Sequence, residues 1–144
     1  MNDGDTGEAL DVQMAMGLAP LLACVEAHPG TWRTREGAMP YFEYGAEAER
    51  LSAAIYQTGL PLAFDWMAWS DQARQNRECP SRLAQADLPT LRHLLFYHLR
   101  ADRFVEGHLA GVLGDGHLGS VLRRIPRLLA GDAASHEGPA VTEG

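Results

Sequence analysis

The sequence predicts an all-α protein: a compact single-domain bundle of about five to six short helices, with at most a minor strand near residues 39–44. Apolar residues recur at spacings of three and four in several segments, and no stretch alternates convincingly between apolar and polar residues. Apolar residues make up 46% of the 144-residue chain and charged residues 22%, so the composition is that of a globular protein. A chain of this length can bury one sizeable core.

Charge separates the central part of the chain from its two ends. Residues 1–11 and 131–144 contain acidic residues but no arginine, whereas residues 12–130 contain all 12 arginines and an equal number of acidic residues. Gly and acidic residues dominate residues 1–11, and Gly, Ala, Ser and Pro dominate residues 131–144. We therefore expect a disordered acidic N-terminal segment (1–11), a single helical domain (12–130) and a disordered acidic C-terminal tail (131–144).

Two helices are expected in the N-terminal half. Residues 18–27 carry leucines at helical spacing, and the sequence His28-Pro29-Gly30 ends the segment. Residues 46–58 carry apolar residues on one face and are followed by Gly59, a residue type common directly after a helix. The strand expected near residues 39–44 lies between these two helices.

Asp65 is placed to N-cap a third helix, in which Trp66, Trp69 and Ala73 share a face. Two tryptophans three residues apart have two interpretations. In the first they are core anchors, and in the second an exposed pair lines the cleft of a partner or ligand.

The clearest helix covers residues 88–101. The Asp87 carboxylate can accept a hydrogen bond from the amide of Thr90, and leucines follow at spacings of three and four. His98 falls in the middle of the apolar arc. A histidine in that position is ordinarily a core residue with one satisfied hydrogen bond.

Two further helices are expected over residues 105–113 and 117–129. Pro126 is expected to kink or interrupt the second one. The glycines from Gly114 to Gly119 match a dinucleotide-binding pattern as a string, but that pattern requires a preceding strand, and here a helix precedes it. We therefore interpret them as a tight turn between helices.

Several function classes are disfavoured by residue content. Lysine is absent, which excludes a Schiff-base or P-loop lysine. Cys24 and Cys79 lack paired spacing and are expected to be reduced thiols. No signal peptide or long apolar span is found, so we expect a cytoplasmic protein without a membrane segment.

Metal, cofactor and nucleic-acid binding are also disfavoured. His93 and His98 are five residues apart, which is poor spacing for a metal site, and no cofactor is expected. Arg123, Arg124 and Arg127 could touch nucleic acid, but a domain without net charge lacks the usual basic surface.

The polar face of the helix 88–101 carries Arg92, Phe96 and Arg100 at four-residue spacing, and Arg103 extends this face if the helix continues. An aromatic ring between arginines suits a planar anion, because the ring stacks and the guanidinium groups donate. The alternative is an ordinary solvated helix face.

The tract from Arg100 to His108 is the densest polar segment of the domain, and two interpretations stay open. In the first it is a structural corner, where Asp102 caps the next helix, Glu106 pairs with Arg103 and Gly107 permits a close approach. In the second, the two arginines bind a phosphate or carboxylate while Glu106 or His108 handles a proton.

The chain resembles a family of small, uncharacterised bacterial and phage proteins classified only as a domain of unknown function. The similar segments are an F-D-W-x-x-W segment at 64–69, the leucine-rich segment 91–95, an R-x-x-R-F-x-E-G-H core at 100–108 and Leu122-Arg123-Arg124. The likeness extends from near Trp32 to near Leu128. It implies a shared helical fold and carries no chemistry.

Two function classes follow. The favoured one is a non-enzymatic protein-interaction module, encoded by a bacterium, phage or mobile element and acting on a larger bacterial assembly. The alternative is a binding protein or enzyme for a small anionic ligand, with Arg100 and Arg103 as a clamp and Glu106 as a base. The candidate residues for either role are Asp65, Trp66, Trp69, Arg92, Phe96, Arg100, Arg103, Glu106 and His108.

Overall fold

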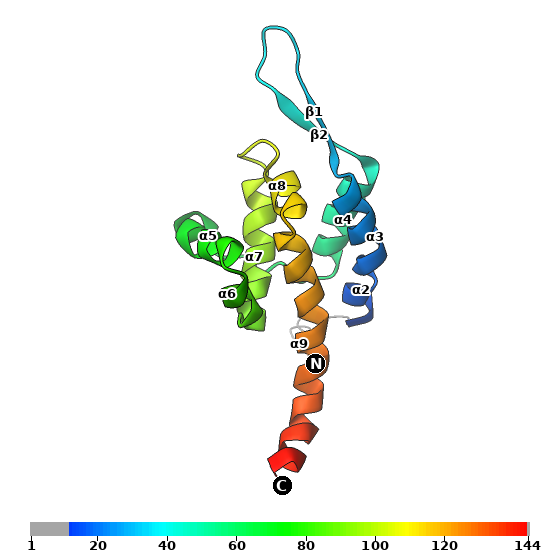
Figure 1. The fold of residues 1–144 in the computed structure, drawn as a ribbon, viewed down its shortest axis with the longest axis vertical. Coiled ribbons are helices and arrows are strands. Elements are labelled where there is room, and N and C mark those ends of the chain that lie inside the picture. The colour runs from blue at the N-terminus through cyan, green and yellow to red at the C-terminus, as the bar shows by residue number, and fades with distance from the viewer. Residues whose placement is uncertain (1–11, 144) are drawn as a thin grey trace.

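The structure is a computed structural model that describes residues 12–143, with side chains described for residue 13 and residues 15–131. It shows a mostly helical domain from which a two-stranded hairpin projects (Figure 1). The predicted fold class is therefore confirmed, including its small strand content. The N-terminal segment 1–11, for which disorder was expected, lies outside the described residues.

The elements follow one another along the chain with short connections. In order they are α2 (Val12–Met16), α3 (Leu18–Ala27), β1 (Gly30–Arg33), β2 (Tyr41–Tyr44), α4 (Ala46–Gln57), the 3-10 turn η1 (Trp66–Trp69), α5 (Ser70–Glu78), α6 (Pro80–Ala84), α7 (Leu88–Ala101), α8 (His108–Gly114) and α9 (His117–Glu143).

Helix α7 lies at the centre of the core, and its leucines form one apolar face that packs into it. Asp87 accepts a hydrogen bond from the Thr90 amide at 3.0 Å, as predicted, and so fixes the start of the helix. The helix packs against α8 and α9, while α3 packs against α4 and α9. Four leucines of α7 are buried in the resulting core: Leu91, Leu94, Leu95 and Leu99.

The two strands pair antiparallel, so that Trp32 lies opposite Phe42 and Arg33 lies opposite Tyr41. The rings of Trp32 and Phe42 contact edge to face, with centroids 5.4 Å apart. β2 lies within the stretch where a minor strand was expected. β1 was not predicted, because all but its first residue are exposed and its sequence shows no alternation.

Two expected helix starts are shifted by local geometry. Asp65 makes no capping hydrogen bond with its side chain, and the segment after it forms the η1 turn before α5 begins at Ser70. The helix expected from residue 105 begins only at His108, because Gly107 adopts a left-handed conformation with φ of 75°.

Helix α9 is the other departure from expectation. It continues through Pro126, which was expected to kink or interrupt it, and runs to Glu143 (Figure 1). A proline removes only one hydrogen bond of a helix, and here buried Leu122 and Ile125 hold the same helix on the core. Residues 131–143, where a disordered tail was expected, fall within the bounds of α9.

No helix within residues 12–143 is both long and apolar enough to cross a membrane.

Candidate functional site

Asp102 is the centre of the connection between α7 and α8. Its Oδ1 atom accepts hydrogen bonds from the Tyr44 hydroxyl at 2.6 Å and from the Leu109 amide at 2.8 Å. The Tyr44 hydroxyl in turn accepts from the Ala110 amide at 3.1 Å. Burial and the bond to Asp102 raise the pKa of Tyr44, so its hydroxyl stays protonated. Asp102 therefore caps α8, as predicted, and also ties it to the hairpin.

Glu106 and Gly107 complete what we call the α7–α8 corner, which consists of Asp102, Glu106 and Gly107 with their hairpin contacts. Glu106 accepts from the Phe42 amide at 2.6 Å rather than pairing with Arg103. A Cβ atom on Gly107 would lie 2.7 Å from Cζ2 of Trp32. The close approach predicted at this glycine is thus present, and the structural interpretation of the tract accounts for both carboxylates.

The predicted arginine face of α7 is only partly free. The Arg92 side chain donates to the carbonyl oxygens of Leu60 at 2.9 Å and Gly59 at 3.0 Å, so it holds the chain after α4. The Arg100 guanidinium lies 5.6 Å from the centroid of the Phe96 ring, a cation–π distance. Nε of Arg100 is buried without a hydrogen-bond partner among the described residues.

The two predicted tryptophans are half-buried and contact other aromatic rings. Trp66 stacks on Phe104 with centroids 5.7 Å apart and meets Tyr97 edge to face at 5.6 Å. Trp69 meets Phe64 edge to face at 5.1 Å. The pair is therefore neither fully core nor fully exposed, and Asp65 beside it is exposed.

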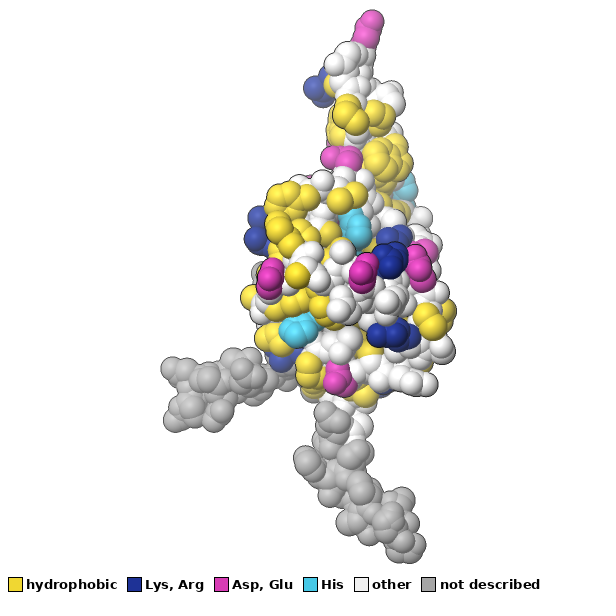
Figure 2. All heavy atoms as spheres, turned by 90° about the vertical axis from the view of Figure 1, so that its left-hand side faces the viewer, with side chains coloured by type: hydrophobic (Ala, Val, Ile, Leu, Met, Phe, Trp, Pro, Cys, Tyr) yellow, Lys and Arg dark blue, Asp and Glu magenta, His cyan; other side chains and the backbone are white. Residues whose placement is uncertain are grey.

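Large apolar side chains continue across the surface from the hairpin to η1. Trp32 is 54% exposed and lies against Gly107, while Phe104 is 67% exposed and lies on Trp66. Val105, between them in sequence, is also exposed. We call Trp32, Trp66, Phe104 and Val105 the apolar ridge. Figure 2 shows hydrophobic side chains along the projecting hairpin and on the body directly below it.

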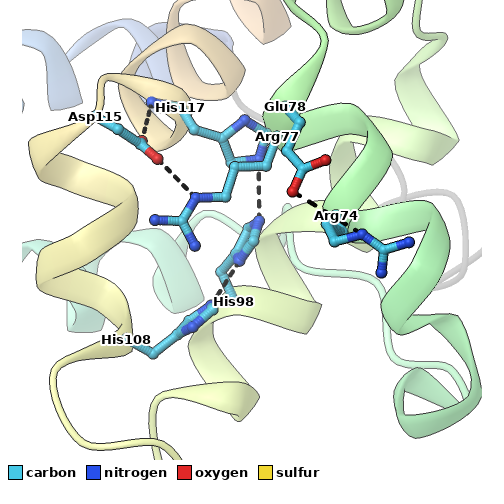
Figure 3. Close-up of polar contacts among 7 residues, drawn as sticks. All are labelled: Arg74, Arg77, Glu78, His98, His108, Asp115 and His117. Carbon is cyan, nitrogen blue, oxygen red and sulfur yellow. Dashed lines mark hydrogen bonds and ion pairs between the residues drawn. The ribbon is translucent and has the colours of Figure 1, made fainter.

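Three histidines from three helices form a second polar centre, which we call the histidine triad. His98 of α7 is 1% exposed, and its Nδ1 atom lies 2.9 Å from Nε2 of His108, the first residue of α8. Its Nε2 atom lies 3.0 Å from Nε2 of His117, the first residue of α9 (Figure 3). One hydrogen bond was expected for His98, but the structure shows two, and both partners are imidazole rings.

Burial dominates the protonation of the triad. It lowers the pKa of His98 well below the ordinary value, and it lowers the pKa of His117 to about 4. It also lowers the pKa of His108, and the positive charge of Arg77 acts in the same direction on all three rings. The triad is consequently uncharged at neutral pH.

Arg77 of α5 is anchored beside the triad. Its Nε atom donates to Oδ2 of Asp115 at 2.6 Å, and Oδ1 of the same carboxylate accepts from the His117 amide at 2.9 Å. Asp115 thus joins the start of α9 to α5 (Figure 3). The terminal amino groups of Arg77 have no hydrogen bond to any residue that the structure describes.

A cavity of about 510 Å³ opens between α5, α7 and the connection from α8 to α9, and we call it the histidine cavity. Its wall includes two of the triad rings, the guanidinium of Arg77 and the ring of Tyr97. The complete lining is Ser70, Ala73, Arg74, Arg77, Glu78, Tyr97, His98, His108 and Asp115. Among the described residues, no group of three or more His, Cys, Asp or Glu side chains is arranged to hold a metal ion.

Of the nine predicted site residues, only His108 lines this cavity. Trp69 lines a separate, open cavity with Asp87 and Thr90. Neither of these two cavities is lined by the other predicted residues Asp65, Trp66, Arg100, Arg103 or Glu106. The arginines Arg123 and Arg124 pair with Glu26 and with the Ala86 carbonyl, respectively.

His117, Arg77 and Tyr97 were not predicted as site residues from the sequence. The available signal was weak: two of the triad histidines each begin a helix, directly after a glycine. Their ring contacts span ten and nineteen residues, so helical periodicity could not reveal them.

Fold and surface define a small helical domain with a projecting hairpin. The model of a family of unknown function, DUF6508, matches residues 20–131, and the chain belongs to that family. No curated protein matches the sequence, and no solved structure matches it either.

Proposed function

We propose that this protein is a non-enzymatic interaction module that binds a protein partner through the apolar ridge. The observation that supports this most is the clustering of large exposed apolar side chains at the hairpin, the α7–α8 connection and η1: Trp32 lies against Gly107, and Phe104 stacks on Trp66. Exposed apolar residues gathered in one place mark interaction surfaces more often than scattered ones do.

Ring contacts that restrict Trp32 and Phe104 support the same proposal. Trp32 is fixed by the ring of Phe42 and by the backbone of Gly107, and Phe104 is fixed by the ring of Trp66. A preorganised surface loses less side-chain entropy when it binds than a mobile one does. Aromatic anchors of this kind dominate the energy of many protein interfaces.

Arg103 gives the partner a charge requirement. It is exposed and follows α7 beside Phe104, and no ion pair or side-chain hydrogen bond holds it within the described part of the chain. The partner proposed here therefore carries an apolar patch with a carboxylate opposite Arg103. The resemblance to bacterial and phage proteins makes a component of a larger cytoplasmic assembly the partner to look for.

The alternative function, an anion site built from Arg100, Arg103 and Glu106, has less support. Glu106 already accepts the Phe42 amide, and Arg100 lies over Phe96. A base for catalysis needs a free acceptor beside a substrate cavity, and Glu106 lines neither the histidine cavity nor the open cavity beside Trp69.

Site-specific photo-crosslinking in the native host tests the proposal. A benzophenone amino acid replaces Phe104 in one variant and, as the matched control, Tyr56 of α4, an exposed aromatic residue on another element. We expect one discrete protein adduct from position 104, no adduct from position 56, and loss of the adduct when Arg103→Glu is added. Equal adducts at both positions, or none at 104, would contradict the proposal. If the only adduct joins two copies of this chain, the ridge mediates self-association, and the proposal of a separate partner is replaced.

A further inference from the structure

The three imidazoles of the triad form a chain that can carry a proton in either direction. Each ring contact requires one nitrogen to donate and the other to accept. In one arrangement His117 donates to His98, and His98 donates to His108. In the other arrangement both bonds are reversed, and the remaining proton moves from Nδ1 of His108 to Nδ1 of His117. His98, held at the centre, makes both arrangements available without moving any ring.

The same counting limits the charge of the chain. Each of the two contacts holds one proton, and each terminal Nδ1 atom can hold one more. The uncharged triad has three protons, so one additional proton fills the last position without breaking a hydrogen bond. A second additional proton would place two N–H groups against each other at about 3 Å. The triad is therefore built to store one proton.

The charges around the histidine cavity balance while the triad is neutral. Arg74 and Arg77 line it together with Glu78 and Asp115. Tyr97 and Asp102 also lie near His108, and the carboxylate of Asp102 partly offsets the effect of Arg77 on its pKa. A bound anion with one negative charge would leave the cavity one charge short of neutrality, and a single proton on the triad restores that balance.

Arg77 provides the donors for such an anion. Asp115 holds Nε, which orients the guanidinium, and the two terminal amino groups are left for a ligand. A guanidinium with two donors in one plane matches the two oxygens of a carboxylate. The ring of Tyr97 and the side chain of Ala73 supply apolar wall for a small organic body.

We propose that the histidine cavity binds a small monocarboxylate, which Arg77 holds through its terminal amino groups while the histidine triad takes up one proton from solvent. A monocarboxylate fits better than a phosphate dianion because the triad compensates one negative charge and not two. The cavity shares no lining residue with the apolar ridge, although Tyr97 of its wall contacts Trp66, and the inference does not depend on the proposed interaction function.

Calorimetric titration with acetate, butyrate and benzoate between pH 7.5 and pH 5.5 tests this proposal. Each titration is repeated in two buffers of different ionisation enthalpy, which gives the number of protons taken up on binding. These ligands are mostly ionised across that range, and the small protonated fraction of each free acid is subtracted, so the remaining proton uptake belongs to the protein. We expect saturable binding of at least one of them, an association constant that rises by up to tenfold per pH unit as the pH falls, and uptake of no more than one proton per ligand.

Arg77→Gln is expected to weaken binding at least tenfold, while Arg82→Gln, an exposed arginine on α6, leaves it unchanged. Arg77→Lys, which keeps the charge without the planar fork, should fall between them. Absence of saturable binding by all three acids, an affinity independent of pH, or equal affinity in wild type and Arg77→Gln would overturn the proposal. The proton count needs no variant, so it remains decisive if Arg77→Gln does not fold.

Discussion

The α7–α8 corner and the histidine triad both lie at the C-terminal end of α7, yet they use polar groups in opposite ways. In the corner, Asp102 and Glu106 accept hydrogen bonds from the chain itself. In the triad, the Nδ1 atoms of His108 and His117 and the terminal amino groups of Arg77 have no hydrogen bond among the described residues, and both His108 and Arg77 line a cavity. A dense polar tract in the sequence can therefore serve the fold, while a site forms where hydrogen-bonding capacity is left over.

Removal of the Asp102 carboxylate should have the largest effect on stability. Asp102→Ala deletes the cap of α8 and one partner of the buried Tyr44 hydroxyl, so we expect the free energy of unfolding to fall by about 3 kcal/mol. Asp65→Ala is the matched control, because that carboxylate makes no capping bond, and it should change stability by less than about 0.5 kcal/mol. Urea denaturation of both variants measures this, and equal losses would argue against a structural corner.

Gly107 tests the contact between the corner and the hairpin. Both Gly107 and Gly37 have positive φ, 75° and 79°, but only at Gly107 would a Cβ atom meet the Trp32 ring. Gly37→Ala should cost about 1–2 kcal/mol from backbone strain alone, and Gly107→Ala should cost more. Adding Trp32→Ala should recover the excess. If the two alanine variants unfold at the same denaturant concentration, the ring contact contributes nothing.

The triad predicts a loss of stability in acid. Its histidines have lowered pKa values in the folded state, so below the ordinary value of 6.5 the unfolded chain binds more protons than the native protein. The contribution of the neutral histidines to the free energy of unfolding is therefore fully present above pH 6.5 and decreases as the pH falls. For His117 this decrease continues to about pH 4, its pKa in the folded protein. The contribution of His117 to this loss between pH 7 and pH 5 is about 2 kcal/mol.

Urea unfolding at several pH values checks this dependence, with His117→Gln for comparison. The variant should lose less stability on acidification than wild type does, whereas His28→Gln, which changes an exposed histidine outside the triad, should follow wild type. Parallel curves for wild type and His117→Gln would show that His117 is not held in its neutral form.

Arg103→Ala should have the smallest effect on the fold. Its side chain is exposed and has no partner among the described residues, so the free energy of unfolding should change by less than about 0.5 kcal/mol. The same variant should weaken partner binding, because Arg103 provides the charge beside the apolar ridge. A thermal melt measures the effect on stability. A melting temperature far below that of wild type would mean that Arg103 holds the corner.

Local signals explain which parts of the fold could be predicted. Helix α7 matches its expected range because the Asp87 cap and the leucine spacing lie within the segment itself. The first strand could not be predicted, since its residues pair only with β2 and carry no pattern of their own. The start of α8 depended on the conformation of Gly107, which the contact with Trp32 favours but the local sequence does not specify.

The candidate site was predictable only in part for the same reason. The Arg100 to His108 tract is contiguous, so the sequence could raise both a structural and a functional interpretation of it. The triad is assembled from α7, α8 and α9, and its anchor Arg77 comes from α5. Such a centre depends on how four helices pack, which no spacing within one segment encodes.

The most direct test of the contrast between corner and triad is a pH titration of the histidine ring nitrogens by long-range ¹H–¹⁵N NMR. The structure predicts that His98, His108 and His117 are uncharged at pH 7 and that their signals shift together below pH 6.5, as one shared proton is taken up. Three rings that titrate independently near pH 6.5, each as an imidazole in water does, would contradict a hydrogen-bonded chain with spare capacity for one proton.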